Sequence, residues 1–320
     1  MSNHRLHTDG VALVSVLLIV AILMAIASRL LATHDLVITQ HANTFAQNQA
    51  LHYVLGAETL ARQALYEDLT ESGPETDHLN ELWAQPTMPF ELDEGGFLEA
   101  QMRDLNGCFN LNNLVGSENN LAVERFQRLA SNLGIQPQIA QTWKDWIDAD
   151  EEVTGFGAED RDYLIAQPAY RTPNRLVTDL SELYLMQNVD PEQLALLLPH
   201  ICLLPETDTL INVNTANAQT LAALDKGLTL DMIEPMTLEE RTYESIDSFI
   251  VENEDFAPAA DALSTKSAYF LLHAQAQVGD SLVTMQSLLY RNPESGVVEV
   301  LRRDFGKLFR SNLISDTEEA

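Results

Sequence analysis

The most prominent feature of the hydrophobic pattern is an uninterrupted apolar run near the start of the chain. Residues 11–28 read VALVSVLLIVAILMAIAS, eighteen positions without a charged side chain, and charge returns at Arg29. An α-helix rises about 1.5 Å per residue, so a run of this length extends about 27 Å, close to the hydrocarbon thickness of a bilayer. The pattern therefore predicts a helix that enters a membrane.

The leader before this run, MSNHRLHTDG, allows three interpretations. A secretory signal peptide would be cut near the small residue Ala27, but Arg5 is the only strongly basic residue of the leader, and the apolar run is longer than such signals usually have. An uncleaved anchor would give Gly10 no special role. In the third interpretation the leader is removed after Gly10, so that Val11 becomes the amino terminus of an intact hydrophobic helix.

Helical spacing continues beyond the apolar run. Residues 34–70 contain no proline. Five apolar residues recur there near one face at helical spacing: Leu51, Leu55, Ala61, Leu65 and Leu69. The pattern predicts one long helix, half in lipid and half packed on a soluble domain. A membrane anchor followed by a separate core helix is the alternative.

The soluble part begins with a loop and a strand. Residues 71–96 are rich in proline, glycine and acids, which is typical of a loop. Residues 97–103 alternate between apolar and polar side chains and predict a strand, and the DLNG sequence at 104–107 predicts the turn of a hairpin.

A helical block separates this strand from later ones. Residues 121–204 have helical periodicity, including a segment VTDLSELYLMQ, and INVNTA leads into another helix that Asn214 or Thr215 would cap. Alternation returns near the end and predicts three strands, at residues 267–279, 282–290 and 297–303. Strands on both sides of an insertion can complete one sheet, so the sequence predicts an α+β fold with an antiparallel sheet and an inserted helical domain.

Charge narrows the range of partners. The chain has 48 Asp and Glu residues against 18 Lys and Arg, a net charge of −30, and an ordinary hydrophobic content of 46%. Nucleic-acid binding depends on lysine and arginine, so we expect no nucleic-acid partner. An excess of carboxylates favours hard cations such as calcium.

The densest acidic cluster has eight carboxylates within residues 145–162. Asp148 and Asp150 lie on a loop, and glycines at positions 155 and 157 can bend the chain so that Glu159 and Asp160 come near them. Three or four oxygen ligands around one point suit calcium, although the twelve-residue pattern of an EF-hand is absent. On charge alone, a solvated acidic loop explains the cluster as well.

The two cysteines, Cys108 and Cys202, are far apart in the sequence and lack the spacing of a zinc site. A disulfide between them and two buried free thiols are both open, because their distance cannot be read from the sequence. No histidine or nucleophile pattern of an enzyme is visible, so we expect a protein without catalytic activity.

The amino terminus resembles a known signal. A short leader that ends in glycine directly before the apolar run is similar to the class III signal of type IV pilins and pseudopilins, which a prepilin peptidase cuts after the glycine. Most members of that family carry Glu at the fifth mature position, whereas this chain has Ser15. The absence of that glutamate is typical of the K-type minor pseudopilin of the type II secretion system.

Motifs along the rest of the chain strengthen this resemblance. They occur in the order found in the K-type family and are FNLNNL at 109–114, WIDADEE at 146–152, GAEDRDY at 157–163, SELYLM at 181–186, INVNTA at 211–216 and AYFLLHAQAQVGD at 268–280. The resemblance implies a pseudopilin fold, in which a long amino-terminal helix lies on a sheet and a large helical domain is inserted between strands. It also implies cleavage by prepilin peptidase between Gly10 and Val11, and methylation of the new terminus.

The resemblance further implies calcium in the helical domain. We therefore expect the ligands among five acidic residues: Asp148, Asp150, Glu151, Glu159 and Asp160. The predicted organisation is a leader at 1–10, a transmembrane segment at 11–31, a helix continuation at 32–70, a pseudopilin domain at 71–114 and 265–310, and an inserted helical domain at 115–264.

The expected function is that of a minor pseudopilin at the tip of the type II secretion pseudopilus, where it caps or initiates assembly for the export of folded proteins. The implied partners are the I-type and J-type minor pseudopilins, and the implied location is the bacterial inner membrane, with one span and a periplasmic soluble domain. One alternative is a calcium-dependent binding module, secreted or membrane-tethered, that is unrelated to pili. Another is a metal-dependent hydrolase that uses the acidic loop.

Overall fold

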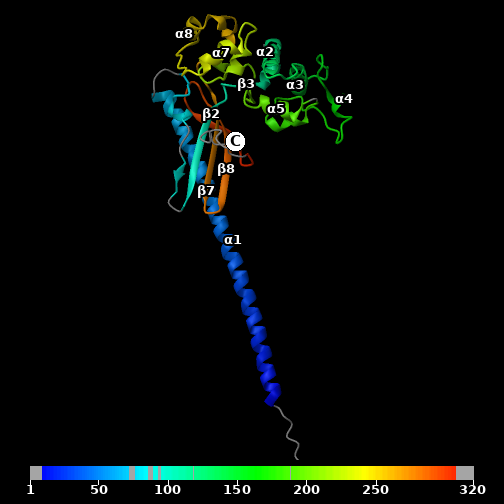
Figure 1. Cartoon of the computed structure of the whole chain (residues 1–320), viewed down its shortest axis with the longest axis vertical. Coiled ribbons are helices and arrows are strands. Elements are labelled where there is room, and N and C mark those ends of the chain that lie inside the picture. The colour runs from blue at the N-terminus through cyan, green and yellow to red at the C-terminus, as the bar shows by residue number, and fades with distance from the viewer. Residues whose placement is uncertain are drawn as a thin grey trace, which may run out of the picture.

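One straight helix and a head at its far end make up the molecule (Figure 1). The computed structural model describes residues 9–71, 76–85, 89–92, 95–117, 119–187 and 189–307, with the side chains of residues 9–12, 71 and 119 left out. Helix α1 (Asp9–Glu71) is continuous over 63 residues, which corresponds to a length of about 95 Å. The prediction of a single helix through the apolar run and beyond it is confirmed.

The second half of α1 packs on a five-stranded antiparallel sheet of order β1-β2-β7-β8-β9. The strands are β1 (Phe90–Glu91), β2 (Gly96–Asp104), β7 (Tyr269–Val278), β8 (Ser281–Arg291) and β9 (Val298–Asp304). Ala50 and Val54 of α1 are fully buried against Ala274 and Ala276 of β7. Small side chains on both surfaces let the helix approach the sheet closely, and the alternation of β7 gives the sheet its apolar face.

A glutamate fixes the position of α1 on this sheet. Glu58 is 3% exposed and accepts hydrogen bonds from the Ser287 hydroxyl at 2.6 Å and from Arg303 Nε at 2.7 Å. Burial raises the pKa of Glu58, but the hydrogen bonds and charge of Arg303 and the Ser287 hydrogen bond outweigh it and hold the pKa below its ordinary value.

The predicted insertion consists of two helical lobes, each with its own core. The first lobe contains β3 (Phe109–Asn110), η2 (Leu111–Val115), α2 (Asn119–Asn132), α3 (Ile139–Ile147), α4 (Asp160–Tyr163), η3 (Leu180–Leu185), α5 (Pro191–Leu197) and β4 (Ile201–Cys202). The second lobe contains β5 (Ile211–Asn212), α6 (Ala218–Ala222), α7 (Leu230–Thr237), α8 (Ile246–Glu252), η4 (Glu254–Ala262) and β6 (Leu263–Ser264). A further short helix, η1 (Leu82–Ala84), covers the sheet domain beside β2.

Each lobe is closed where it joins the sheet domain, because its first and last strands pair in parallel, β3 with β4 and β5 with β6. Arginines of α2 connect the lobes: Arg125 Nε donates to the Leu224 carbonyl at 3.2 Å and Arg128 Nε to the Ala223 carbonyl at 2.8 Å. In Figure 1 both lobes lie at the end of the sheet that is farthest from the free half of α1. The predicted α+β arrangement, with an antiparallel sheet formed by strands on both sides of the insertion, is confirmed.

Three local predictions were wrong. The DLNG sequence makes a turn, in which the Asn106 amide donates to Asp104 Oδ1 at 2.7 Å, but no hairpin follows, since the next strand, β3, pairs with β4 in another sheet. The segment VTDLSELYLMQ forms the 3₁₀ helix η3 and no α-helix.

The cap of α6 is the third error. Asn217 caps this helix and accepts the Thr220 amide at 3.0 Å. Asn214 instead pairs with both backbone groups of Tyr243, and Thr215 donates to Asp104 Oδ2 at 2.5 Å. The two residues that were expected to cap the helix are therefore used in tertiary contacts.

Candidate metal centre

The acidic loop is held by the carboxyl end of α3. This helix buries Trp143, Trp146 and Ile147 in the core of the first lobe, which fixes its direction. Asp148 follows as the C-cap, and its backbone amide donates to the Lys144 carbonyl at 2.9 Å. The carboxylate of Asp148 is thus carried by a rigid element.

Three carboxylates meet at this point. One oxygen each of Asp148, Asp150 and Glu159 lies within 4.8 Å of the others. Glu159 is 2% exposed, and Oδ1 of Asp148 is buried without a hydrogen-bond partner in the part of the chain that the structure describes. Buried acceptors without partners are uncommon in proteins, so this group lacks a donor or a cation.

The crowding of these carboxylates also raises the pKa values of two members of the group. Burial, together with Asp145 and Asp148, raises the pKa of Glu159 to about 7, and burial with Asp150 and Asp145 raises the pKa of Asp148 to about 6. Both shifts have the same physical cause, because carboxylates out of water and near one another disfavour the charged form. A divalent cation at this point would reverse both shifts.

A fourth carboxylate shapes the loop. Asp145 is fully buried, and its two oxygens accept the Thr154 amide at 3.2 and 3.0 Å. A Cβ atom at position 157 would lie 2.0 Å from Asp145 Oδ2, so only glycine fits there. Gly155 has φ of 59°, in the left-handed region that favours glycine. The bend that was expected from these glycines is present, and it brings Glu159 to Asp148.

Two of the five expected ligands lie outside the group. Glu151 is exposed, and Asp160 already has partners, since its Oδ1 accepts the Thr172 amide at 2.9 Å and its Oδ2 pairs with Arg171 at 2.7 Å. The Thr172 hydrogen bond, followed by Arg171, lowers the pKa of Asp160 in spite of some burial.

Asn174 is a residue of the site that was not predicted from the sequence. This residue and Lys144 line a pocket of about 420 Å³ together with Asp148 and Asp150. Asn174 Nδ2 donates to the Asp150 carbonyl at 3.3 Å, while its Oδ1 is buried and finds no partner among the described residues. Its φ of 44° is a conformation that Asn tolerates better than most residues, which is the one local feature that distinguishes it.

The donor set fits calcium. It consists of carboxylate oxygens on an irregular loop, with an amide oxygen nearby, and calcium takes 6–8 oxygen ligands at about 2.3–2.6 Å in flexible geometry. No thiolate or imidazole is present in this group, so zinc or copper is less suitable.

A second carboxylate group differs in one respect. Asp68, Asp77 and Glu81 also lie within 4.8 Å of one another, but Arg291 reaches into this group and pairs with Asp68 Oδ2 at 3.0 Å and with Asp77. A protein cation therefore already occupies the position that a metal would take.

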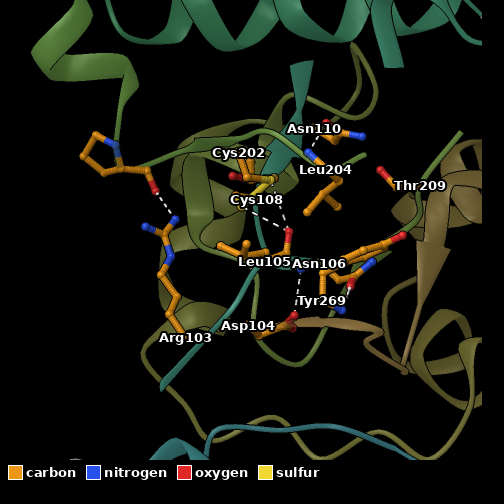
Figure 2. Close-up of a disulfide and its surroundings, with 12 residues drawn as sticks. Arg103, Asp104, Leu105, Asn106, Cys108, Asn110, Cys202, Leu204, Thr209 and Tyr269 are labelled. Carbon is orange, nitrogen blue, oxygen red and sulfur yellow. Dashed lines mark hydrogen bonds between the residues drawn. A yellow bond between two sulfur atoms is a disulfide. The ribbon is translucent and has the colours of Figure 1, made fainter. Parts of the chain in front are cut away.

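The two cysteines meet at the base of the first lobe. The structure joins Cys108 and Cys202 by a disulfide with a Cα–Cα distance of 5.8 Å, and both side chains are buried. Figure 2 shows the bond beside the Leu105 carbonyl, whose oxygen lies 3.1 Å from Cys108 Sγ and 3.2 Å from Cys202 Sγ. Nearby, Arg103 Nη2 donates to the Pro199 carbonyl at 2.9 Å, so the chain that enters the lobe is tied twice to the chain that leaves it.

The free half of α1 is the other functional region. Among the described residues, one helix is long and apolar enough to cross a membrane, and its apolar window has no part buried within the protein. Gly10 and Val11 belong to this helix, and residues 1–8 of the expected leader lie outside the described residues.

Comparisons with known proteins place the chain in a family. Residues 107–206 match the family model described as "Type II secretion system (T2SS), protein K". Type II secretion system protein K of Pseudomonas aeruginosa is 36% identical over 319 residues, which cover 95% of this chain and 94% of the relative. The same protein of Klebsiella pneumoniae is 34% identical over 319 residues, with 93% and 96% covered.

A solved structure agrees with these relatives. The chain resembles, with a TM-score of 0.73 and 29% identity, one chain of the GspK-GspI-GspJ complex from the type 2 secretion system of enterotoxigenic Escherichia coli, over 84% of this chain and 99% of the other. The relatives are named as components of a secretion system and not as enzymes. The chain therefore belongs to the type II secretion system protein K family and is a minor pseudopilin with the α+β pseudopilin fold.

Proposed function

We propose that this minor pseudopilin caps the type II secretion pseudopilus and initiates its assembly, with α1 anchored in the inner membrane and the head in the periplasm. The observation that carries the proposal is the position of the two lobes. They extend from the end of the sheet that is farthest from the apolar half of α1 (Figure 1), where they would obstruct a subunit stacked above this one. Such a subunit fits the tip of a filament that serves the export of folded proteins.

The amino terminus supports the same position. Prepilin peptidase would cut between Gly10 and Val11, and α1 runs through both residues, so that removal of the leader leaves the rest of the helix unchanged. Methylation of Val11 would follow. Ser15 at the fifth mature position places no carboxylate in lipid and cannot form an ion pair with the terminal amine of a neighbour, which disfavours addition beneath another subunit.

Calcium would be held by Asp148, Asp150 and Glu159, and it would supply charge neutralisation and structural rigidity. The three residues belong to the end of α3 and to the loop before α4, so a cation that binds all three joins the two ends of this loop. Its role is to order the outer edge of the first lobe and not to perform a reaction.

The I-type and J-type minor pseudopilins are the proposed partners, because the related K protein was solved in one complex with GspI and GspJ. The direct test is co-purification of the full chain with both partners of its own system. Recovery of all three in one complex supports a place at the tip, and recovery of this chain alone contradicts it.

The alternative of a secreted, calcium-dependent binding module rests on the small residues that precede Ser28. Sequencing of the mature amino terminus separates the two functions. A terminus at Val11 supports the pseudopilin, and a terminus at Ser28 supports the secreted module.

A further inference from the structure

The five-stranded sheet has one face that α1 covers and one that it does not. Leu98 and Ala100 of β2 pack toward α1, as Ala276 of β7 does. Successive side chains of a strand point to opposite faces, so the residues between these positions lie on the other face. We name it the outer face of the sheet. On β2 and β7 it is polar, since it carries Glu99 and Gln275.

A row of three polar residues crosses the outer face at right angles to the strands. Glu99 of β2 pairs in register with Gln275 of β7, and Gln275 pairs with Thr284 of β8. Gln275 Nε2 donates to Glu99 Oε2 at 2.9 Å. Neighbouring strands lie about 4.8 Å apart, so the backbone distance from Thr284 to Glu99 along this row is about 10 Å.

Glu99 is deeply buried on the outer face, where it is 6% exposed. The helices that pack most extensively on β2 are α1 and η1, and they lie on its other face, where Ala100 and Met102 share a core with Trp83. Glutamate is rarely buried to this degree unless it is paired. Gln275 supplies a neutral hydrogen bond, and a cation over the outer face would supply the charge that a buried carboxylate requires. We therefore expect a basic side chain above Glu99.

The chain itself enters the outer face near the end of the described residues. β9 ends at Asp304, and the Gly306 amide donates to Asp304 Oδ1 at 2.8 Å, which bends the chain away from the line of the strand. The Lys307 carbonyl then accepts the Thr284 hydroxyl at 3.0 Å. Because the Thr284 side chain belongs to the outer face, Lys307 lies on that face, at the first position of the polar row.

A second contact of Lys307 reaches the first lobe. Its Nζ lies 3.4 Å from Oδ1 of Asp179, which is the N-cap of η3. Arg302 of β9 pairs with the other oxygen of Asp179 at 3.6 Å. Lys307 therefore contacts the sheet and the first lobe at once.

We propose that the chain continues from Lys307 along the polar row and that Arg310 pairs with Glu99. Residues 308–320 lie outside the described residues, and Arg310 is the only Lys or Arg among them. An extended chain advances about 3.3 Å per residue, so the three residues from Lys307 to Arg310 span about 10 Å. This length equals the distance from Thr284 to Glu99. Opposite charge and matching length select the same residue.

We name residues 307–310 the C-terminal strap. The strap supplies Glu99 with charge-assisted hydrogen bonds and joins the first lobe to the far side of the sheet. A peptide of another protein is the competing occupant of the outer face. The strap has the advantage because Lys307 is already held at the start of the row, so that only a short segment has to be ordered.

The first test is limited trypsin digestion of the full chain in mild detergent, without partner proteins. Trypsin cleaves after Arg310 only when the strap leaves the sheet. We expect Glu99→Gln to accelerate this cleavage at least about tenfold, because loss of about 1.4 kcal/mol of holding free energy gives that factor. Cleavage after Lys226, in an exposed turn of the second lobe, should not change, and it distinguishes release of the strap from general unfolding. Glu91→Gln, at an exposed site of β1, is the matched control.

The second test changes the strap and leaves the sheet intact. Arg310→Glu places two carboxylates together and should lower the melting temperature by about 2–4 °C, whereas Asn312→Glu, which adds a negative charge two residues further on, should lower it by less than about 1 °C. Unchanged cleavage after Arg310 in Glu99→Gln, or equal melting temperatures of Arg310→Glu and Asn312→Glu, overturns the strap. Neither result bears on the proposed function, since no partner is present.

Discussion

Replacement of Arg291 by methionine tests what holds the head together. The Arg291 side chain is 2% exposed, and its guanidinium pairs with Asp68 Oδ2 at 3.0 Å and with Asp77, and donates to the Ser267 carbonyl at 2.9 Å. It also lies 5.0 Å from the centre of the Phe270 ring. One side chain therefore connects the end of α1, the loop after it, the segment that returns from the second lobe, and β8.

The expected loss is large because Asp77, one of the two carboxylate partners of Arg291, is almost completely shielded from water. The Asp77 side chain is 1% exposed, and removal of one member of a buried ion pair costs about 3–5 kcal/mol. A domain is stabilised by only about 5–15 kcal/mol, so Arg291→Met should remove about a fifth or more of that free energy of unfolding. Arg291→Lys keeps the positive charge but loses the planar guanidinium that contacts several acceptors at once. We therefore expect it to lower the free energy of unfolding by less than Arg291→Met does.

The assay is urea unfolding of the full chain in a non-denaturing detergent, followed by tryptophan fluorescence. Trp83 packs edge-on against Phe270 with a centroid distance of 5.1 Å, so its emission reports on the region around Arg291. Arg302→Met is the matched control. Its ion pair with Asp179 at 3.6 Å is solvent-exposed, with 43% of the arginine side chain accessible, and such pairs contribute about 0–1 kcal/mol.

The pH dependence gives a second measurement. Burial raises the pKa of Asp77 from its ordinary value of 3.8 to about 6, although Arg291 opposes this shift. The folded protein therefore binds a proton between about pH 4 and 6 that the unfolded chain has released, so the charged form of Asp77 destabilises the fold above about pH 6. The loss caused by Arg291→Met should shrink as pH falls from 7.5 to 5. A loss below about 1 kcal/mol at pH 7.5, equal to that of Arg302→Met, would refute the reasoning.

Three further predictions concern the metal centre, the helix contact and the disulfide. Added calcium should raise the melting temperature of the wild type and of the control Glu151→Gln but not that of Glu159→Gln. Without metal, the wild type should become less stable as pH rises from about 4.5 to about 7, because the pKa of Glu159 is raised from 4.5 to about 7 in the folded state. Glu58→Ala leaves Arg303 and Ser287 without their acceptor, so the free energy of unfolding in urea should fall by about 1–3 kcal/mol. The control Glu67→Ala changes an exposed site of the same helix and should lower it by less than about 0.5 kcal/mol. Cys108→Ser should destabilise the chain by about 4 kcal/mol because the disulfide closes a sequence separation of 94 residues, and the unfolded wild type should react with a thiol reagent only after reduction.

Strong periodicity made the framework predictable. The alternation of β7 predicted a strand at residues 267–279, and the structure has it at Tyr269–Val278. Absence of proline and an apolar stripe predicted the second half of α1, where Ala61 and Leu65 are buried as expected. These signals are readable because every residue of the segment contributes to them, so that one irregular position does not change the result.

The carboxylate group of the candidate metal centre was predictable to the extent that it is local. Asp148 and Asp150 are two residues apart, and the bend that returns Glu159 to them is made by glycines within the same loop. Asn174 was not predictable, because it reaches the site from a distant segment through a tertiary contact with the Asp150 carbonyl.

The same distinction explains the missing hairpin. Asp104 and Asn106 have good turn chemistry, and they do form a turn. Their remaining groups, however, bind residues that are far away in the sequence: Asp104 Oδ2 accepts the Ser267 hydroxyl at 2.6 Å, and Asn106 Oδ1 accepts the Ala268 amide at 3.0 Å. The turn therefore leads into the insertion and not into a hairpin. This outcome depends on contacts with residues 267–268, which are far away in the sequence.

The distribution of arginine explains how so acidic a chain remains folded. Several of its few basic residues donate to backbone carbonyls of another element, and they are Arg62 to Val298, Arg103 to Pro199, Arg125 to Leu224, Arg128 to Ala223, Arg241 to Val213 and Ala216, and Arg291 to Ser267. These hydrogen bonds join α1 to β9, the sheet domain to the first lobe, and the first lobe to the second. The guanidinium groups thus donate hydrogen bonds within the protein, to backbone carbonyls that would otherwise lack a donor near the ends of helices and strands. Fewer basic side chains are therefore left to neutralise the 48 Asp and Glu residues, which leaves the chain with its net charge of −30.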